Sequence, residues 1–351
     1  MTDLTKTLVE QVQSYLGNQQ YFSIHGGKSF DFLLGDYSEQ HQIDMSAHCG
    51  IIDYQPSELF IKMHAGTRIC EVQQKLKKQN QQLPTDFPQF SAQATIGGAI
   101  ALGLTGSSRP FYGAIRDHIL GCGLINGKAE LLKFGGQVMK NVAGYDISRL
   151  LSGSCGTLGI IMDVTLKVIP AAESNTTLVL DMDAVEAISN MQRLARLPLP
   201  VSACAYLNQQ LFVRLSGNLQ GVNSAVKTVG GEKLKQAELF WTSINNHQHD
   251  FFQPGDNLWR VILPANSPPL LADSEPLIDW CGGQHWYHCD SASRVQQATR
   301  QAGGYASRFR KGAPHYLHIE NSRVKQLQQK IKQAFDANNY FNPALYAAMV
   351  S

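Results

Sequence analysis

The chain has 351 residues, with 30 Lys+Arg and 28 Asp+Glu, which gives a formal net charge of +2. At roughly 150 residues per domain this length predicts two domains. The balanced charge gives no reason to expect binding to a nucleic-acid backbone, which needs a clustered basic face. No apolar stretch is long enough to cross roughly 30 Å of hydrocarbon, so any membrane association is expected to be peripheral.

The seven cysteines indicate a reducing compartment. Their number is odd, and no Cys-x-x-Cys pair exists that would mark a zinc ribbon or a thioredoxin-type motif. The first residues lack the basic and apolar regions of a secretory signal. We therefore expect a cytoplasmic protein.

In the first eighty residues, apolar periodicity predicts a helix, four strands and a second helix. The helix covers 4–16, and the strands cover 21–25, 43–45, 51–54 and 59–65. Thr67 is expected to cap the second helix, whose apolar face holds Ile69, Val72 and Leu76. Leu83-Pro84 is expected to end this segment.

Residues 84–170 are dominated by glycine. Repeated glycines weaken helix and strand interiors by about 0.5–1 kcal/mol each, so this segment predicts a backbone that turns sharply and approaches something flat or anionic. It closes with alternating apolar and polar residues over 160–169, which predict an amphipathic strand ended by Pro170.

Beyond Pro170 the glycines become sparse and helices alternate with strands. Strand–helix–strand–strand–helix–strand patterns predict a two-layer α+β domain of the ferredoxin-like kind. The expected strands are 176–181, 201–207, 210–215, 258–264, 277–280 and 305–309, and the expected helices are 184–195, 221–229 and 291–302. A last helix is expected over 322–338.

Three glycine-rich loops are candidates for binding a nucleotide. Gly26-Gly27-Lys28-Ser29 follows a strand and offers backbone N–H groups, a hydroxyl and an ammonium, which suit a pyrophosphate. Thr95-Ile96-Gly97-Gly98 offers a second set of donors at a helix start, and Gly153–Gly159 a third. A single Gly-Gly is most often an ordinary turn, but three such loops favour a large nucleotide cofactor. The spacing fits neither a Rossmann fingerprint nor a Walker A loop.

These loops belong to a set of motifs that together resemble a known family. The motifs occur in this order: His25-Gly26-Gly27-Lys28-Ser29, Ala65-Gly66-Thr67, Leu83-Pro84-Thr85-Asp86, Thr95-Ile96-Gly97-Gly98, Arg116-Asp117, Lys140-Asn141-Val142-Ala143-Gly144-Tyr145-Asp146 and Gly153-Ser154-x-Gly156-Thr157-Leu158-Gly159. They resemble the FAD-binding domain of the vanillyl-alcohol oxidase / p-cresol methylhydroxylase (PCMH) flavoproteins over residues 20–170. The whole chain is most similar to the FAD-binding subunits of bacterial glycolate oxidases.

The resemblance implies an α+β fold: a PCMH-type two-subdomain FAD-binding domain followed by a ferredoxin-like α+β C-terminal domain. The implied domains are the FAD-binding domain at 1–170, a substrate or cap domain at 171–320, and a C-terminal helix and tail at 321–351 that return to the FAD domain. Phe335-Asp336 and Phe341-Asn342-Pro343 match that return segment.

The resemblance also implies roles for individual residues. Gly26, Gly27, Lys28 and Ser29 would lie on the FAD pyrophosphate, with Thr95, Gly97 and Gly98 on the other side. The remaining implied cofactor-binding residues are Pro84, Asp86, Asp117, Gly144, Tyr145, Gly156, Thr157, Gly159 and Ile160. The position where covalent relatives often carry a His is Lys28, so non-covalent FAD is expected.

The implied activity is oxidation of glycolate or a related short 2-hydroxy acid to the 2-oxo acid. The implied partners are a second FAD-binding subunit and an iron–sulfur subunit that receives the electrons, and the complex would touch the cytoplasmic face of the inner membrane peripherally. One alternative is a non-catalytic structural or electron-relay flavin subunit beside a catalytic sister chain. Another is a flavoenzyme like UDP-N-acetylenolpyruvoylglucosamine reductase.

No catalytic residue is assigned from the sequence, because the His-x-Gly-Asp-type motif of relatives that oxidise 2-hydroxy acids is not found here. No metal site is expected either. Cys281, His285, His288 and Cys289 have a spacing that resembles metal ligands. The favoured interpretation is nevertheless a strand end with incidental residues, because no matching knuckle accompanies them.

Overall fold

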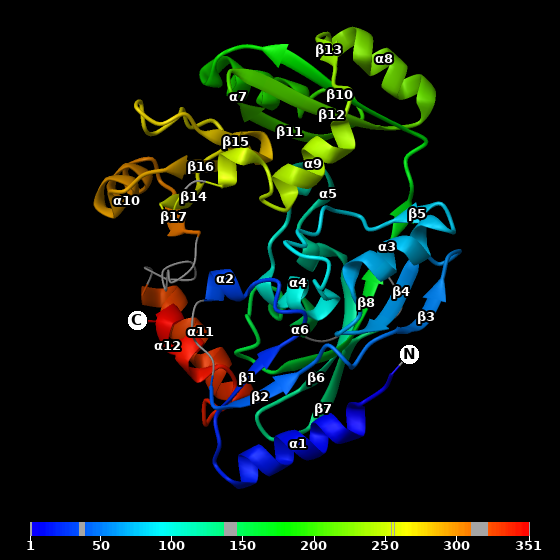
Figure 1. Cartoon of the computed structure of the whole chain (residues 1–351), viewed down its shortest axis with the longest axis vertical. Helices are drawn as coiled ribbons and strands as arrows, with labels where there is room; N and C mark the ends of the chain where they lie inside the picture. Colours follow the sequence, from blue (N-terminus) through cyan, green and yellow to red (C-terminus); the bar gives the residue numbers. More distant parts are fainter. Residues whose placement is uncertain are drawn as a thin grey trace. The chain divides into compact units, whose positions relative to one another are not determined.

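The structure is a computed structural model that describes residues 2–34, 39–136, 146–253, 255, 257–309 and 322–350. The described residues form two compact units. The first lies within Met1–Leu104, Ala114–Pro170 and Lys311–Ser351, and the second within Thr105–Gly113 and Ala171–Arg310. The chain thus passes from one unit to the other after Pro170, and each unit has its own sheet (Figure 1).

The first unit is built on a five-stranded antiparallel sheet in the order β3-β4-β8-β6-β7. Its strands are β3 (Ile51–Gln55), β4 (Phe60–His64), β6 (Ile119–Ile125), β7 (Leu131–Gly135) and β8 (Ile160–Lys167). The sequence predicts an amphipathic strand over 160–169, but the strand found there, β8, has no exposed face. β8 is central, so both its faces are largely buried, and Asp163 is held by Lys62 of β4 at 3.0 Å.

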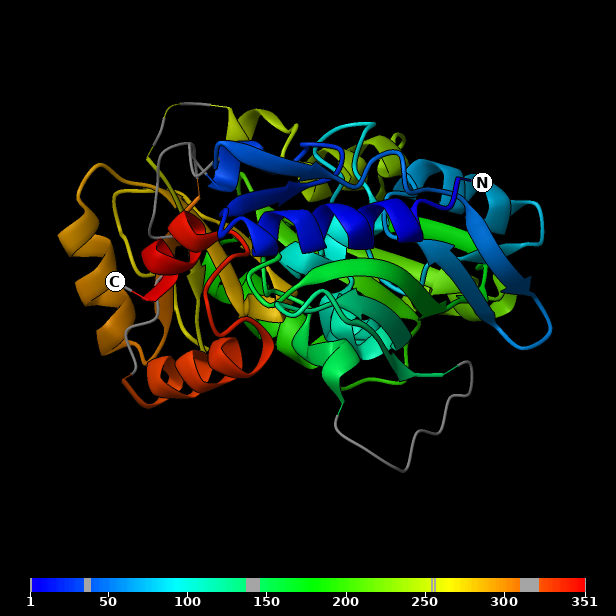
Figure 2. The ribbon, with the colours of Figure 1, turned by 90° about the horizontal axis from the view of Figure 1, so that it is seen from below.

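A parallel pair of short strands, β1 (Phe22–His25) and β2 (His41–Asp44), carries the N-terminal helix α1 (Thr5–Gly17). Helix α1 runs beside these strands (Figure 2). The centre of the Tyr15 ring of α1 lies 5.3 Å from that of the Phe22 ring, and Gln11 donates a hydrogen bond to the Gln42 carbonyl. Phe341, near the C-terminus, forms an isolated parallel β-bridge with Phe22 of β1. The first strand therefore has both ends of the chain packed around it.

Short helices and a small strand pair complete the first unit. They are α2 (Asp31–Leu34), α3 (Ile69–Lys77), β5 (Gln81–Gln82), α4 (Ile96–Leu102), η1 (Ile115–His118), α6 (Ile147–Leu150), β9 (Ile169–Pro170), α11 (Ser322–Phe335) and α12 (Pro343–Val350). The predicted Thr67 cap of α3 is wrong: Arg68 precedes the helix, and the Thr67 hydroxyl instead donates to the His64 carbonyl at 2.7 Å. Pro170 is predicted to end the strand that begins at 160. It lies instead in the short strand β9, where it pairs with Gln81 of β5.

The second unit contains one eight-stranded sheet in the order β13-β10-β12-β11-β15-β16-β14-β17, and every pairing is antiparallel. Its strands are β10 (Ser174–Asp181), β11 (Val201–Leu207), β12 (Gln210–Gly217), β13 (Glu232–Lys233), β14 (Leu258–Ile262), β15 (Leu277–Asp279), β16 (Gln284–His288) and β17 (Tyr305–Arg308). Its helices are α5 (Arg109–Tyr112), α7 (Ala184–Leu194), α8 (Leu219–Val229), α9 (Ala237–Asn245), η2 (Asp250–Phe252), η3 (Trp280–Gly282) and α10 (Ala292–Gln301).

This sheet consists of two ferredoxin-like halves joined edge to edge. In the first half, β10-α7-β11-β12-α8-β13 has the order β13-β10-β12-β11, which is the βαββαβ arrangement that the sequence predicts. The second half repeats the strand order as β15-β16-β14-β17, with α10 before its last strand. The halves meet where Tyr206 of β11 pairs with Ile278 of β15. The α+β class is confirmed.

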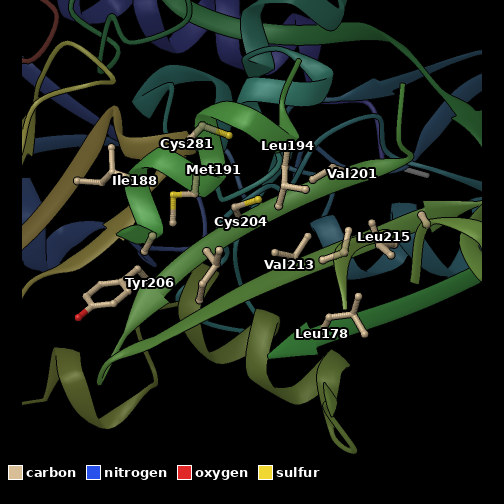
Figure 3. Packing of buried hydrophobic residues seen from close by; sticks show 14 of the residues in the cluster. Leu178, Ile188, Met191, Leu194, Val201, Cys204, Tyr206, Val213, Leu215 and Cys281 are labelled. Carbon is tan, nitrogen blue, oxygen red and sulfur yellow. The ribbon is translucent and has the colours of Figure 1, made fainter. Parts of the chain in front are cut away.

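The core of the first half shows why these residues form these elements. Helix α7 turns Ala187, Ile188, Met191 and Leu194 to one face, at the spacing that places side chains together on a helix (Figure 3). They pack on the inward side chains of β10, β11 and β12. The four tryptophans, Trp241, Trp259, Trp280 and Trp286, are all buried.

Residues 105–113 belong to the second unit, although the glycine-rich pattern around them predicts a continuous first domain. Side-chain contacts explain the difference. The Ser107 hydroxyl donates to Asp279 at 3.0 Å, the Arg109 guanidinium lies 4.1 Å from the Trp280 ring centre, and Phe111 packs against the α7 core. Among the described residues, no helix is both long and apolar enough to cross a membrane.

Candidate cofactor site

A cleft in the first unit brings the three glycine loops together. Water-sized molecules can occupy about 100 Å³ of it, and it is partly open to solvent. Its lining comes from the end of β1, the loop after it, α4 and the segment before β8: Ile24, His25, Gly26, Gly27, Lys28, Ser29, Phe30, Asp31, Met45, Ala65, Thr95, Gly97, Gly98, Ala101, Leu102, Cys155, Gly156, Gly159 and Ile161.

The loop from Gly26 to Ser29 exposes successive backbone N–H groups to this cleft. Among the described residues, none of these four N–H groups donates a hydrogen bond. Lys28 has φ +54°, in the left-handed region that non-glycine residues adopt rarely. A left-handed residue within a run of N–H groups forms a concave nest that binds anions. This loop is therefore built as an anion site, with the Lys28 ammonium beside it.

Contacts behind the loop fix its shape. A Cβ on Gly27 would overlap the Gln93 carbonyl, so only glycine allows the two backbones to approach this closely. The Ser29 hydroxyl hydrogen bonds with the Ser91 hydroxyl at 2.6 Å. Segment 91–93 thus holds the nest from behind while its N–H groups face the cleft.

The second glycine loop, at the start of α4, lines the same cleft but offers few donors. Ile96 N–H donates to the Thr67 carbonyl at 2.9 Å and Gly97 N–H to the Ala65 carbonyl at 2.8 Å. Gly98 N–H donates to the Thr95 hydroxyl at 3.2 Å, an N-cap bond. The sequence analysis expects this loop to offer backbone N–H donors to the cofactor. That expectation is wrong, because these three N–H groups already donate to acceptors within the protein. Glycine is needed at 97 because a Cβ would lie 2.7 Å from the Ala65 Cβ.

The third loop is tied to the C-terminal part of the chain. Asn342 donates to the Cys155 carbonyl at 2.8 Å and accepts from Ile24 N–H at 2.9 Å, so it joins the loop to β1. Gly156 has φ +69°, and a Cβ there would lie 2.8 Å from Asn342 Nδ2. One side chain therefore sets the spacing between two walls of the cleft.

A buried ion pair that sequence reasoning missed supports the third loop. Lys332 and Asp336 of the C-terminal region are 4% and 1% exposed, and their charged atoms lie 2.6 Å apart. Lys332 also donates to the Thr157 carbonyl at 2.7 Å, and Asp336 accepts from the Tyr340 and Phe341 N–H groups. The sequence signals this pair only by its i, i+4 spacing. That spacing does not distinguish a buried ion pair from an exposed one on a helix surface.

Two titratable groups in the cleft are held neutral or nearer to neutral. Burial raises the pKa of Cys155 to about 12, so its thiol is protonated at neutral pH. Burial also raises the pKa of Asp31, although Lys28 and His25 oppose the shift.

Five other predicted residues are absent from the lining of this cleft: Pro84, Asp86, Asp117, Thr157 and Ile160. Ile160 is buried in the sheet, paired with Ile125 of β6, and the cleft is lined instead by its neighbour Ile161. Asp117 accepts from Ala114 N–H at 2.9 Å and lies 4.0 Å from Arg149. Gly144 and Tyr145 lie outside the described residues. Arg149 also pairs with Asp146 at 2.9 Å, and both side chains are half exposed.

The cluster at 281–289 is not arranged as a metal site. His285 hydrogen bonds with Tyr287 Oη and the Gly282 carbonyl, both at 3.1 Å. His288 hydrogen bonds with Asn257 Oδ1 at 3.0 Å and the Phe251 carbonyl at 2.7 Å. Both imidazoles are therefore used by their neighbours, as the favoured sequence interpretation holds.

The cleft fits an FAD molecule on its own chemistry. Four free backbone N–H groups and an ammonium match the charge of a pyrophosphate. Residues 26–29 would hold the pyrophosphate, while Ala101, Leu102 and Ile161 provide apolar lining.

Comparison with known proteins agrees with this assignment. Residues 8–135 match the family model described as an FAD binding domain. The chain is 35% identical over 349 residues to glycolate oxidase subunit GlcE of Escherichia coli, covering 99% of both chains. It is 33% identical over 229 residues to a D-lactate dehydrogenase of Anaerostipes hadrus, covering 65% of this chain and 47% of that one.

The fold has solved counterparts. The structure superposes on alkyldihydroxyacetonephosphate synthase with a TM-score of 0.70 and 14% identity, covering 96% of this chain and 75% of that one. At this identity the likeness concerns the fold alone. On the full-length match and the FAD-binding domain, the chain is an FAD-dependent oxidoreductase subunit and belongs to the family of the glycolate oxidase GlcE subunits, within the PCMH-type flavoproteins.

Proposed function

We propose that this chain binds FAD non-covalently and serves in a complex that oxidises glycolate, or a closely related short 2-hydroxy acid, to the 2-oxo acid. The observation that carries the proposal is the nest of free N–H groups at Gly26–Ser29, which lies in the cleft lined by all three glycine loops. The full-length similarity to GlcE supports the substrate class, since that protein is named as a glycolate oxidase subunit. We propose a second FAD-binding subunit and an iron–sulfur subunit as partners.

The residues of the cleft bind and orient rather than react. Gly26–Ser29 hold the pyrophosphate by backbone N–H groups, and Lys28 adds a positive charge that side-chain motion can bring to the phosphates. Asn342 keeps the loop at 155–156 at a fixed distance from β1. Bound FAD supplies the two-electron redox chemistry of a flavin, which no side chain of the protein provides.

A second candidate function is a flavin subunit that supports a catalytic sister chain without oxidising substrate itself. The histidines of the second unit favour it: His285 and His288, both described, already have hydrogen-bond partners at each ring nitrogen. They are thus neither free metal ligands nor free general bases.

The two candidates are separated by anaerobic reduction. The purified chain is expected to be yellow, and acid is expected to release its flavin, which tests non-covalent binding. Glycolate is then added without oxygen, with acetate as the matched control because it lacks the hydroxyl. If glycolate bleaches the flavin of this chain alone, this chain oxidises the substrate. If the flavin bleaches only after the sister FAD subunit and the iron–sulfur subunit are added, the second candidate function is favoured. A folded but colourless chain that takes up no added FAD would contradict both.

A further inference from the structure

We propose that Asp3, His48 and His64 form a binding site for a divalent transition-metal ion of the zinc class. The three residues come from separate parts of the first unit. Asp3 lies just before α1, His48 in the loop after β2, and His64 at the end of β4. One potential ligand atom from each lies within 4.8 Å of the others.

The two histidines are buried without the partners that imidazoles need. His48 is 0% and His64 5% exposed. Both ring nitrogens of His64, and Nε2 of His48, have no hydrogen-bond partner among the described residues. Buried polar atoms of side chains are nearly always satisfied in proteins, so the unpartnered ring nitrogens of His64 indicate a missing ligand.

The geometry allows an ion to approach all three. The ring centres of His48 and His64 lie 4.1 Å apart, and Asp3 Oδ1 lies 3.9 Å from His48 Nδ1. Ligand atoms about 2.0–2.1 Å from a tetrahedral zinc ion lie about 3.3 Å from one another. Ligand atoms that lie within 4.8 Å of one another therefore need to approach by up to about 1.5 Å. Asp3 is half exposed, which gives the ion a path from solvent and leaves room for water as a fourth ligand.

The charges around the site suit a cation. The charged side chains that act on His64 are Asp3, Asp163 and Lys62, and Asp163 and Lys62 pair with each other at 3.0 Å. The Asp3 carboxylate is the acidic group that belongs to the proposed ligand set.

One existing hydrogen bond is exchanged when the ion binds at Nδ1 of His48. That atom accepts from Leu4 N–H at 3.0 Å. Its lone pair would pass to the metal, and the Leu4 N–H, which is partly exposed at the start of α1, would turn to water. The mixed set of two imidazoles and one carboxylate matches zinc, iron, cobalt and nickel better than magnesium or calcium, which prefer oxygen ligands.

The site would have a structural effect. Thr2 already pairs with Cys49 through two backbone hydrogen bonds, at 2.7 and 3.2 Å. A metal ion at Asp3, His48 and His64 would lock this N-terminal segment onto β4, directly behind Met45 and Ala65 of the cofactor cleft. We therefore expect the ion to raise thermal stability rather than to take part in substrate oxidation.

The test uses the full-length flavin-loaded protein, stripped of metal with a chelator and titrated with Zn²⁺ in a calorimeter. The wild type is expected to bind one Zn²⁺ at this site and to unfold at a higher temperature with Zn²⁺ than without. His64→Gln and Asp3→Asn are expected to weaken this binding at least tenfold. His41→Gln, a change of the same kind on β2 outside the trio, is expected to leave it unchanged.

Flavin content and circular dichroism report whether each variant folds. If His64→Gln does not fold, Asp3→Asn decides, because its side chain is exposed and an amide keeps the bond from Thr5. Zn²⁺ affinity and thermal shift equal to wild type in the folded variants would overturn the proposal. A wild type that shows no Zn²⁺-dependent heat or thermal shift would also overturn it.

Discussion

The two glycine loops at 26–29 and 95–98 look equivalent in the sequence but differ in what their backbones do. Both contain a glycine that lets one stretch of backbone approach another: Gly27 against Gln93, and Gly97 against Ala65. The N–H groups of the first loop are free, whereas those at the start of α4 are consumed by Thr67, Ala65 and Thr95. Glycine thus marks close packing in both loops, and only the unused donors mark a ligand site.

The largest effect is expected for Gly27→Ala. The new Cβ would overlap the Gln93 carbonyl, a backbone atom that cannot rotate away. We expect loss of bound flavin and a fall in unfolding free energy of more than about 4 kcal/mol, in the range of exceptional substitutions. The measurement is flavin per protein after gel filtration, with urea unfolding. Gly17→Ala, at a position with open space around it, is the control and should behave like wild type.

Lys332→Met tests the third loop, at Gly153–Gly159. This loop is supported by the buried Lys332–Asp336 ion pair rather than by a close approach of glycine backbone. Removing the ammonium leaves Asp336 buried and without its counter-ion, which costs about 3 kcal/mol. Urea unfolding should show this loss, together with weaker flavin binding because the Thr157 carbonyl loses its donor. Lys330→Met removes an exposed lysine from the same helix and should cost little. Equal stability of the two variants would show that the buried pair does not support the loop.

The smallest effect is expected for Thr95→Ala. This change removes the N-cap hydroxyl that accepts from Gly98 N–H, and such caps contribute about 1 kcal/mol. Unfolding free energy should fall by that amount, while flavin content stays at the wild-type level. Thr95→Ser retains the hydroxyl and should restore stability. If Thr95→Ala released the flavin instead, the second loop would hold the cofactor as directly as the first.

The sequence predicts much of the fold because its patterns are local. Alternation over 160–169 predicts a strand, and β8 occupies Ile160–Lys167. A helix is expected over 184–195, and α7 occupies Ala184–Leu194, with Ile188, Met191 and Leu194 in the core of the first half of the second unit. The pattern does not reveal which strand becomes central in the sheet. Both faces of β8 are buried because β4 and β6 flank it, and β4 lies far from it in the sequence.

The candidate site is predictable in its residue types but not in its hydrogen bonds. Residues 26–29, 95, 97, 98, 156 and 159 line one cleft, yet no local pattern shows that Thr67 and Ala65 already accept from the second loop. The same holds for Lys332 and Asp336, whose spacing does not reveal burial. Residues 105–113 join the second unit through Asp279 and Trp280, which are about 170 positions away.

Amide hydrogen exchange with and without FAD tests the central claim most directly. The N–H groups of Gly26–Ser29 should exchange fast in the flavin-free protein and become strongly protected when FAD is bound. Those of Ile96–Gly98 should exchange slowly in both states, because they already have acceptors within the protein. Unchanged exchange at 26–29 on FAD binding, with new protection only at 96–98, would contradict the account.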